Sequence, residues 1–218
     1  MESNHATVKR RGYDSTRRRL QATQTRTEIL EAAQRLFLSD GYAQTKVAAI
    51  ADVAGVSVET IYKTFGGKPG LVRAIQAHAL AGAGPVPAYL RSDEMRLSER
   101  DPRQVIRNWG TLTTEVAPRV SPILLLIRSA AASDPDMAVL HDEVVQERLR
   151  RMELNARHLY ERGDLRAEIS LAEARDVLWT YSSPELYELL VLRQRWPLER
   201  YGRFIAEAMI AALLPAAG

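Results

Sequence analysis

The stretch that decides the fold reads TKVAAIADVAGVSVETIYKTF, residues 45–65. Its apolar residues recur at helical spacing in two short segments, which we expect to form helices over 46–53 and 58–64. Gly55 stands between them, where a left-handed backbone is needed to swing the second helix across the first. Val56 is apolar, so the turn is expected to pack on the core. The sequence therefore predicts a helix-turn-helix whose second helix can enter the major groove of duplex DNA.

The second helix carries polar side chains on its outer face. We expect base contacts from Val58 to a thymine methyl, from Glu59 to cytosine and from Lys63 to guanine. Hydroxyl and ammonium groups, together with backbone N–H groups at helix N-termini, bind phosphates and fix the register. The further predicted DNA contacts are Thr45, Lys46, Ser57, Thr60, Tyr62 and Lys68. In the alternative interpretation, Thr45 and Ser57 are only helix N-caps. Val58 then packs inside and Lys63 is merely solvated.

Helical periodicity continues on both sides of the motif. A helix is predicted from about Ala22 to Gly41, and another from about Pro69 to Ala81, followed by breaking residues over 82–87. Further helices are expected over 102–117, 122–132, 136–162, 171–182, 184–195 and 198–214, with Pro118 and Pro122 among their stops. The fold class is therefore all-α. The expected divisions are a flexible basic arm over 1–21, a three-helix DNA-binding domain over 22–67 and a helical domain over 68–218.

The run from Arg26 to Leu71, about a fifth of the chain, resembles the DNA-binding domain of the TetR family. The residues that carry the resemblance are Arg26, Ile29, Ala33, Phe37, Gly41-Tyr42, Thr45, Val47, Ile50-Ala51, Ala54-Gly55-Val56-Ser57, Thr60-Ile61-Tyr62, Phe65, Lys68 and Leu71. Between Lys68 and Leu71 the family usually has acidic residues, whereas this chain has Pro69-Gly70. The resemblance implies a homodimer that represses transcription from a palindromic operator and is released by a small molecule. An activator or a ligand-independent regulator of the same fold is the alternative.

Positive charge is concentrated at the N-terminal end. Residues 1–70 hold eleven Lys and Arg against seven Asp and Glu, whereas residues 71–218 hold nineteen against twenty. A localised basic end is typical of a nucleic-acid-binding segment, although a solvated basic tail gives the same pattern. The expected contacts of the arm are Arg10, Arg11, Arg17, Arg18 and Arg19. We expect them to strengthen DNA binding in a salt-dependent way.

The resemblance also implies that the helical domain dimerises and encloses a ligand pocket. The apolar content of the last helices exceeds what one core face needs. Leu186, Leu190, Phe204, Met209 and Leu213 are the predicted dimer contacts. The candidate pocket residues are Trp109, Thr113, Leu124, Arg128, Met152 and Trp179. Arg128 either contacts an anionic ligand or forms an ion pair with an Asp or Glu of the chain. Trp109 and Trp179 either line the pocket or pack in the core.

Several classes of function find no support in the sequence. The chain has no cysteine and its four histidines lack metal-ligand spacing, so neither a metal nor a cofactor is expected. Neither a glycine-rich phosphate loop nor a nucleophile motif occurs, which argues against an enzyme. The first residues lack an apolar signal segment, so we expect a cytoplasmic protein without a membrane partner. A helical interaction module that only resembles a DNA-binding protein is the remaining alternative.

Overall fold

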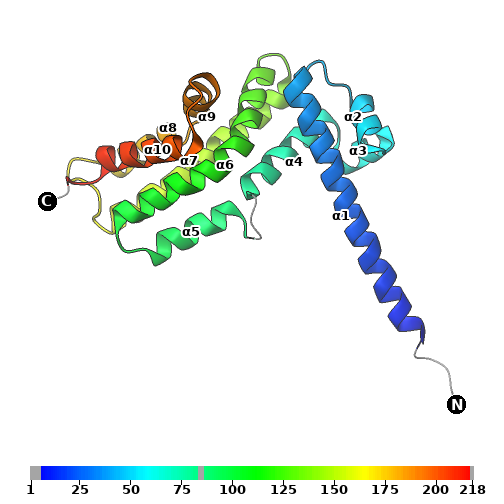
Figure 1. The fold of residues 1–218 in the computed structure, drawn as a ribbon, viewed down its shortest axis with the longest axis horizontal. Coiled ribbons are helices and arrows are strands. Elements are labelled where there is room, and N and C mark those ends of the chain that lie inside the picture. Colours follow the sequence, from blue (N-terminus) through cyan, green and yellow to red (C-terminus); the bar gives the residue numbers. More distant parts are fainter. Residues whose placement is uncertain (1–5, 83–85, 217–218) are drawn as a thin grey trace. The chain divides into compact units, whose positions relative to one another are not determined.

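The computed structural model describes residues 6–82 and 86–216, with side chains from Arg17 onward, and within those ranges its elements are helices joined by turns and loops (Figure 1). The chain divides into two compact units, the first ending at Ile75 and the second beginning at Gln76. No strand occurs among the described residues. The all-α prediction is confirmed.

The first unit contains the predicted three-helix motif. Its helices are α1 (Ala6–Asp40), α2 (Val47–Ala54) and α3 (Val58–Phe65), followed by α4 (Lys68–Ala81), which runs on past the unit boundary. One apolar stripe from each helix is buried, and the shared core includes Ile29, Phe37, Ile50, Ile61 and Leu71. These positions are the ones whose three- and four-residue spacing predicted the helices.

Helix α1 starts earlier than its apolar pattern indicates. It begins at Ala6 and not at about Ala22, so residues 6–21 of the predicted flexible arm are helical. Five of its sixteen residues are Arg, which favours a helix without needing a buried face. Arg17, Arg18 and Arg19 lie on this segment with exposed side chains. The side chains of Arg10 and Arg11 lie outside the described set.

The second unit is built around the long helix α6. Its elements after α4 are α5 (Ala88–Ser98), α6 (Pro102–Ala131), α7 (Pro135–Glu161), α8 (Leu171–Tyr181), α9 (Pro184–Tyr187), a π-helical segment (Glu188–Arg193) and α10 (Leu198–Leu213). Helix α6 packs against α7 and α10, and α7 packs against α8. A core between these helices buries Ile106, Leu159, Leu178, Tyr201 and Ile205.

Two features of this unit differ from expectation. The helices predicted over 102–117 and 122–132 are one helix, with Pro118 and Pro122 inside it. Each proline removes one backbone donor, but buried residues on both sides of them, including Val120 and Ile123, keep the helix packed. No helix was predicted over α5, because its apolar residues have no clear helical periodicity and it lies between two helix-breaking segments.

Helices α6 and α10 approach each other closely at a pair of glycines. A Cβ atom on Gly110 would lie 2.6 Å from the carbonyl oxygen of Gly202 and 2.7 Å from the Cβ of Ala206. A Cβ on Gly202 would lie 2.6 Å from the carbonyl oxygen of Gly110. The two backbones therefore touch where neither residue has a side chain, which fixes how α10 lies on α6.

Candidate DNA interface and ligand pocket

Helix α3 is held by its cap and by one buried side. The hydroxyl oxygen of Ser57 accepts from the backbone N–H of Thr60 at 3.2 Å, so Ser57 is the predicted N-cap. Gly55 has a φ of 65°, the left-handed conformation expected at the turn. Ile61 faces the core, whereas Tyr62 is 53% exposed. The opposite side of the helix is thereby presented to solvent.

The outer face of α3 carries the side chains expected there. Glu59, Tyr62 and Lys63 are exposed, while Val58 and Thr60 are partly buried. Hydrogen bonds from its own backbone N–H and from Ser57 lower the pKa of the Glu59 carboxyl. A fixed negative charge repels phosphates, so among DNA groups Glu59 suits a base-edge donor such as the cytosine amine.

Thr45 has another role than the predicted one. It is 3% exposed, and its hydroxyl donates to the backbone oxygens of Leu36 at 3.1 Å and Gly41 at 2.8 Å. The side chain therefore closes the C-terminal end of α1 and does not face a phosphate. The N-cap position of α2 is Lys46, which is exposed but makes no side-chain cap bond.

Lys68 also serves the first unit internally. Its Nζ donates to the carbonyl oxygen of Tyr42 at 2.6 Å and lies 4.2 Å from the centre of the Tyr42 ring. A cation over an aromatic face with a carbonyl partner is already well satisfied. Lys68 thus ties the start of α4 to the loop before α2, a role that the sequence prediction of a phosphate contact missed.

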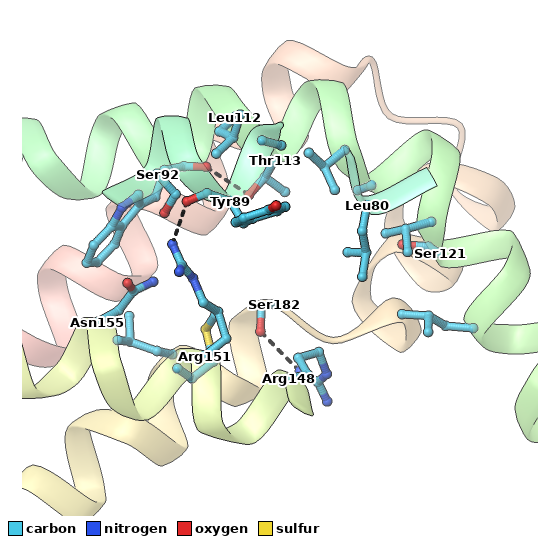
Figure 2. Close-up of a pocket in the computed structure, with 18 of the residues that line it drawn as sticks. Leu80, Tyr89, Ser92, Leu112, Thr113, Ser121, Arg148, Arg151, Asn155 and Ser182 are labelled. Carbon is cyan, nitrogen blue, oxygen red and sulfur yellow. Dashed lines mark hydrogen bonds between the residues drawn. The ribbon is translucent and has the colours of Figure 1, made fainter. Parts of the chain in front are cut away.

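A cavity of about 370 Å³ lies within the second unit (Figure 2). Of the predicted pocket residues, Trp109, Thr113, Leu124 and Met152 line it. The other lining residues come mainly from α4, α5, α6 and α7, and include Gln76, Leu80, Ala88, Tyr89, Ser92, Ser121, Arg148, Arg151, Asn155, Ser182 and Tyr201. The volume and the mostly apolar wall with a few polar groups are typical of small-molecule sites.

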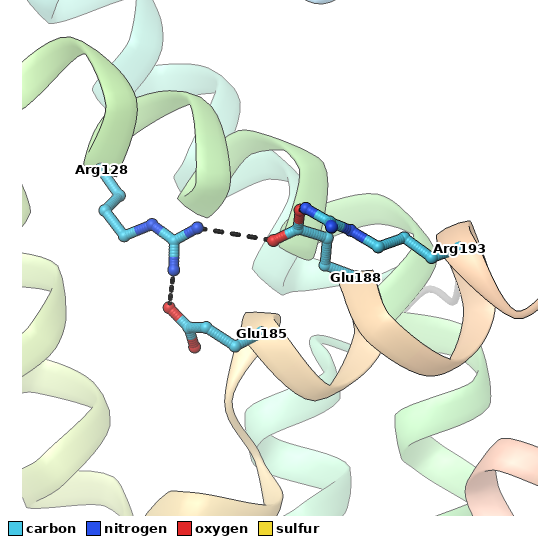
Figure 3. A network of polar contacts seen from close by, with 4 residues as sticks. All are labelled: Arg128, Glu185, Glu188 and Arg193. Atoms are coloured by element: carbon cyan, nitrogen blue, oxygen red, sulfur yellow. Dashed lines mark hydrogen bonds and ion pairs between the residues drawn. The ribbon is translucent and has the colours of Figure 1, made fainter.

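Arg128 lies outside the pocket, and its alternative role as an ion-pair partner is confirmed (Figure 3). Its guanidinium is 2.5 Å from the carboxylate of Glu185 and 3.5 Å from that of Glu188. Arg193 binds Glu188 from the other side at 2.6 Å, and its hydrogen bond is the main cause that lowers the pKa of the Glu188 carboxyl. The network joins α6 to α9 and the π-helical segment.

Trp179 is likewise absent from the pocket lining and forms a platform for Arg148. The Arg148 guanidinium lies 4.6 Å from the centre of the Trp179 ring and donates to the Trp179 carbonyl oxygen. It also donates to the hydroxyl of Ser182 at 3.0 Å. Burial is the main cause that lowers the pKa of Arg148 to about 10, so the group keeps its charge at neutral pH.

The wall that α5 contributes is attached by charged side chains. Arg91 on α5 binds Glu115 on α6 through two hydrogen bonds of 2.8 Å and 2.6 Å. Arg151 on α7 lies 3.0 Å from Asp93 and donates to the Tyr89 carbonyl oxygen at 2.9 Å (Figure 2). The sequence prediction did not include Arg148 or Arg151 of α7. Arg148 lies four residues before the predicted pocket residue Met152, so its helical spacing was a usable signal.

The predicted dimer contacts divide into two groups. Met209 and Leu213 are 5% and 0% exposed, so they belong to the core of the unit and the prediction for them is wrong. Leu186 and Leu190 are partly buried, and Phe204 is 39% exposed. Two apolar side chains that were not predicted, Leu189 and Leu192, are exposed in the π-helical segment. In such a short segment apolar content alone does not tell which side faces inward.

Comparison with known proteins identifies the motif. Residues 29–75, from the middle of α1 into α4, match the model of a family described as bacterial regulatory proteins, tetR family. The match covers about a fifth of the chain, and this part is similar to the DNA-binding domain of the TetR family. This is a family of transcriptional regulators, which agrees with the prediction of a chain that is not an enzyme.

The likeness to individual TetR proteins is partial in sequence and extensive in fold. The transcriptional regulator TtgR of Pseudomonas putida is 46% identical over 55 residues, which cover 25% of this chain and 26% of TtgR. The chain thus matches about a quarter of the length of that curated relative. A structure of the complex of SmeT with triclosan has a TM-score of 0.69 at 21% identity, covering 89% of this chain and 93% of SmeT. NalD, the secondary repressor of a multidrug efflux pump in Pseudomonas aeruginosa, has a TM-score of 0.69 at 19% identity, covering 90% and 99%.

The described residues hold neither of two further kinds of site. No group of three or more His, Cys, Asp or Glu side chains there could hold a metal ion. Over the same ranges no helix combines the length and apolar character needed to cross a bilayer.

Proposed function

We propose that the protein is a TetR-type transcriptional repressor that binds a palindromic operator and is released from it by a small molecule. The exposed outer face of α3, with Ile61 anchoring the opposite side, is the observation that carries the proposal. Tyr62 and Lys63 stand side by side on that face and offer a hydroxyl and an ammonium group to DNA. Because the DNA is in the cytoplasm of a bacterium, we place the protein there.

A homodimer is the state in which two such helices can read two half-sites. Exposed apolar side chains of the π-helical segment and α10, Leu189, Leu192 and Phe204, support a partner surface there. Phe204 also extends an aromatic cluster, with Trp196 at 5.5 Å and Tyr181 at 6.5 Å between ring centres. Aromatic residues are enriched at protein interfaces.

Helix α4 is the element that would connect ligand to DNA binding. Gln76 and Leu80 of α4 line the cavity, and the same helix begins at Lys68 in the first unit. A ligand that tilts α4 changes the separation of the two recognition helices, which the operator fixes. A coupling of about 1–3 kcal/mol lowers operator affinity about 5- to 150-fold. Triclosan bound to SmeT and the description of NalD as a repressor support this assignment.

The test of DNA binding uses Tyr62→Ala and Lys63→Ala. Each variant removes one contact and is expected to weaken binding to DNA upstream of its own gene by about 10-fold, since a base or phosphate contact contributes about 1–3 kcal/mol. Fluorescence anisotropy at several salt concentrations measures the affinity, and sedimentation checks that assembly is unchanged. Arg150→Ala, which removes an exposed charge on α7, is the control and should bind like the wild type. Wild-type affinity in both α3 variants would reject the recognition helix.

A further inference from the structure

The wall of the pocket that α7 forms is polar at regular intervals. Arg148, Met152 and Asn155 all line the cavity, and their spacing of four and three residues places them along one face of the helix. Because an α-helix rises 1.5 Å per residue, Arg148 and Asn155 are separated by about 10 Å along the axis. Along this face of α7, two polar side chains, Arg148 and Asn155, therefore lie on either side of the apolar Met152.

The first position carries a positive charge that no carboxylate balances directly. Among the described residues, the hydrogen-bond partners of Arg148 are neutral, the Trp179 carbonyl oxygen and the Ser182 hydroxyl. Glu185 acts on Arg148 only at a distance, and it already binds Arg128 at 2.5 Å. A guanidinium that is partly withdrawn from water gains most from an anionic partner.

The other arginine of this wall shows the contrast. Arg151 also lines the cavity, but its guanidinium is paired directly with the Asp93 carboxylate at 3.0 Å, which Arg96 also binds at 3.1 Å. Figure 2 shows its further bond to the Tyr89 backbone on one side of the pocket, while Arg148 and Ser182 meet at another edge. Of these two cations, Arg148 is the one whose charge remains for a ligand.

The second polar position has two unsatisfied atoms. Asn155 is 4% exposed and its Oδ1 has no hydrogen-bond partner among the described residues. Trp109 is 7% exposed and its indole Nε1 likewise has none. Buried polar groups without partners are uncommon and costly. A ligand hydroxyl suits Asn155, because it can donate to the amide oxygen or accept from the amide nitrogen.

We propose that the pocket takes an elongated apolar molecule with an anionic head, a carboxylate held by Arg148, and a hydroxyl at the far end held by Asn155. This inference rests on the proposed function in that the same cavity is taken as the effector site. It adds the chemical class of the effector, which nothing in the fold itself specifies.

The experiment uses three rigid probes on the full-length protein. The first is biphenyl with a carboxylate on one ring and a hydroxyl at the opposite end, the second has a neutral carboxamide in place of the carboxylate, and the third lacks the hydroxyl. Dissociation constants are measured by calorimetry without DNA. We expect the carboxylate to bind about 10-fold more tightly than the carboxamide, and the hydroxyl to add a smaller gain.

Variants assign the two ends of the probe. In Arg148→Gln the advantage of the carboxylate over the carboxamide is expected to disappear, whereas in Asn155→Leu only the advantage of the hydroxyl is lost. Arg157→Gln removes a charge of the same kind from an exposed position of α7, where it pairs with Glu153 away from the cavity lining, and should leave all three constants unchanged. Because the comparison of carboxylate with carboxamide on the wild type needs no variant, the test does not depend on the folding of Arg148→Gln.

Two results would overturn the inference, failure of the carboxylate to bind and equal binding of carboxylate and carboxamide to the wild type. The operator assay then separates the inference from the proposed function. A carboxylate that binds through Arg148 without changing DNA affinity supports the ligand class and rejects the regulatory role. Release of DNA by both the carboxylate and the carboxamide at equal concentration supports the regulatory role and rejects the ligand class.

Discussion

Thr45 and Lys68 show how a polar side chain near a DNA-binding helix can serve the fold. Both contact the loop between α1 and α2, Thr45 through the carbonyl oxygens of Leu36 and Gly41 and Lys68 through that of Tyr42. These oxygens lie at or just after the end of α1, where helical partners run out. The two residues therefore position the start of α2.

Replacing Thr45 by valine tests this role at the level of one hydroxyl. Thr45→Val keeps the shape of the side chain but leaves two carbonyl oxygens without their buried donor, so we expect a loss of about 1–3 kcal/mol of stability. Thermal unfolding followed by circular dichroism measures it. Thr23→Val, which removes an exposed hydroxyl bonded to the Arg19 carbonyl oxygen, is the matched control and should change stability by less than about 0.5 kcal/mol. Equal effects of the two changes would contradict the assignment.

At the scale of the elements, the contact of α6 with α10 depends on having no side chain at two positions. Gly110→Ala places a methyl group 2.6 Å from the Gly202 carbonyl oxygen, which only a shift of one helix can relieve. We expect a loss of about 1–3 kcal/mol, as for other overpacked cores. Denaturant unfolding measures the loss.

The control for Gly110→Ala adds one atom where there is room. Ala172→Ser lies on the exposed side of α8 and should leave the unfolding midpoint nearly unchanged. A Gly110→Ala protein as stable as the wild type would show that the two helices are not held at this distance.

How far the sequence predicted these elements depends on the local signal. The helix-turn-helix was predicted nearly to the residue, because Gly55 and Ser57 mark its turn and cap in a local pattern. Pro118 and Pro122 suggested a break that does not occur, since burial on both sides of them outweighs two lost hydrogen bonds. The polar side of the pocket was missed because Arg148 and Asn155 acquire their surroundings only when α7 meets other helices.

At the scale of the whole molecule, assembly with a second copy is the main expectation. The residues available for it are not the ones with the highest apolar content, because Met209 and Leu213 are already buried in the core of their own unit. The exposed set is Leu189, Leu192 and Phe204.

A charge in this exposed set should separate the two copies. Leu189→Glu places a carboxylate in the proposed interface, where its desolvation opposes association, and we expect a monomer at concentrations where the wild type is a dimer. Sedimentation velocity gives the mass. Leu97→Glu on α5 is the control, since Leu97 is 70% exposed and lies outside the proposed interface. A dimeric Leu189→Glu protein would place the partner surface elsewhere, as would dissociation of the Leu97→Glu control.

The attachment of α5 has a consequence for how fast a bound molecule is exchanged. This helix supplies one wall of the cavity, and the contacts from Arg91 to Glu115 and from Arg151 to Asp93 are between partly exposed charges. Dissolved ions weaken such attractions, whereas they hardly affect apolar packing. We therefore expect the residence time of a molecule bound in the cavity to depend on the salt concentration, separately from the affinity that the apolar part of the cavity provides.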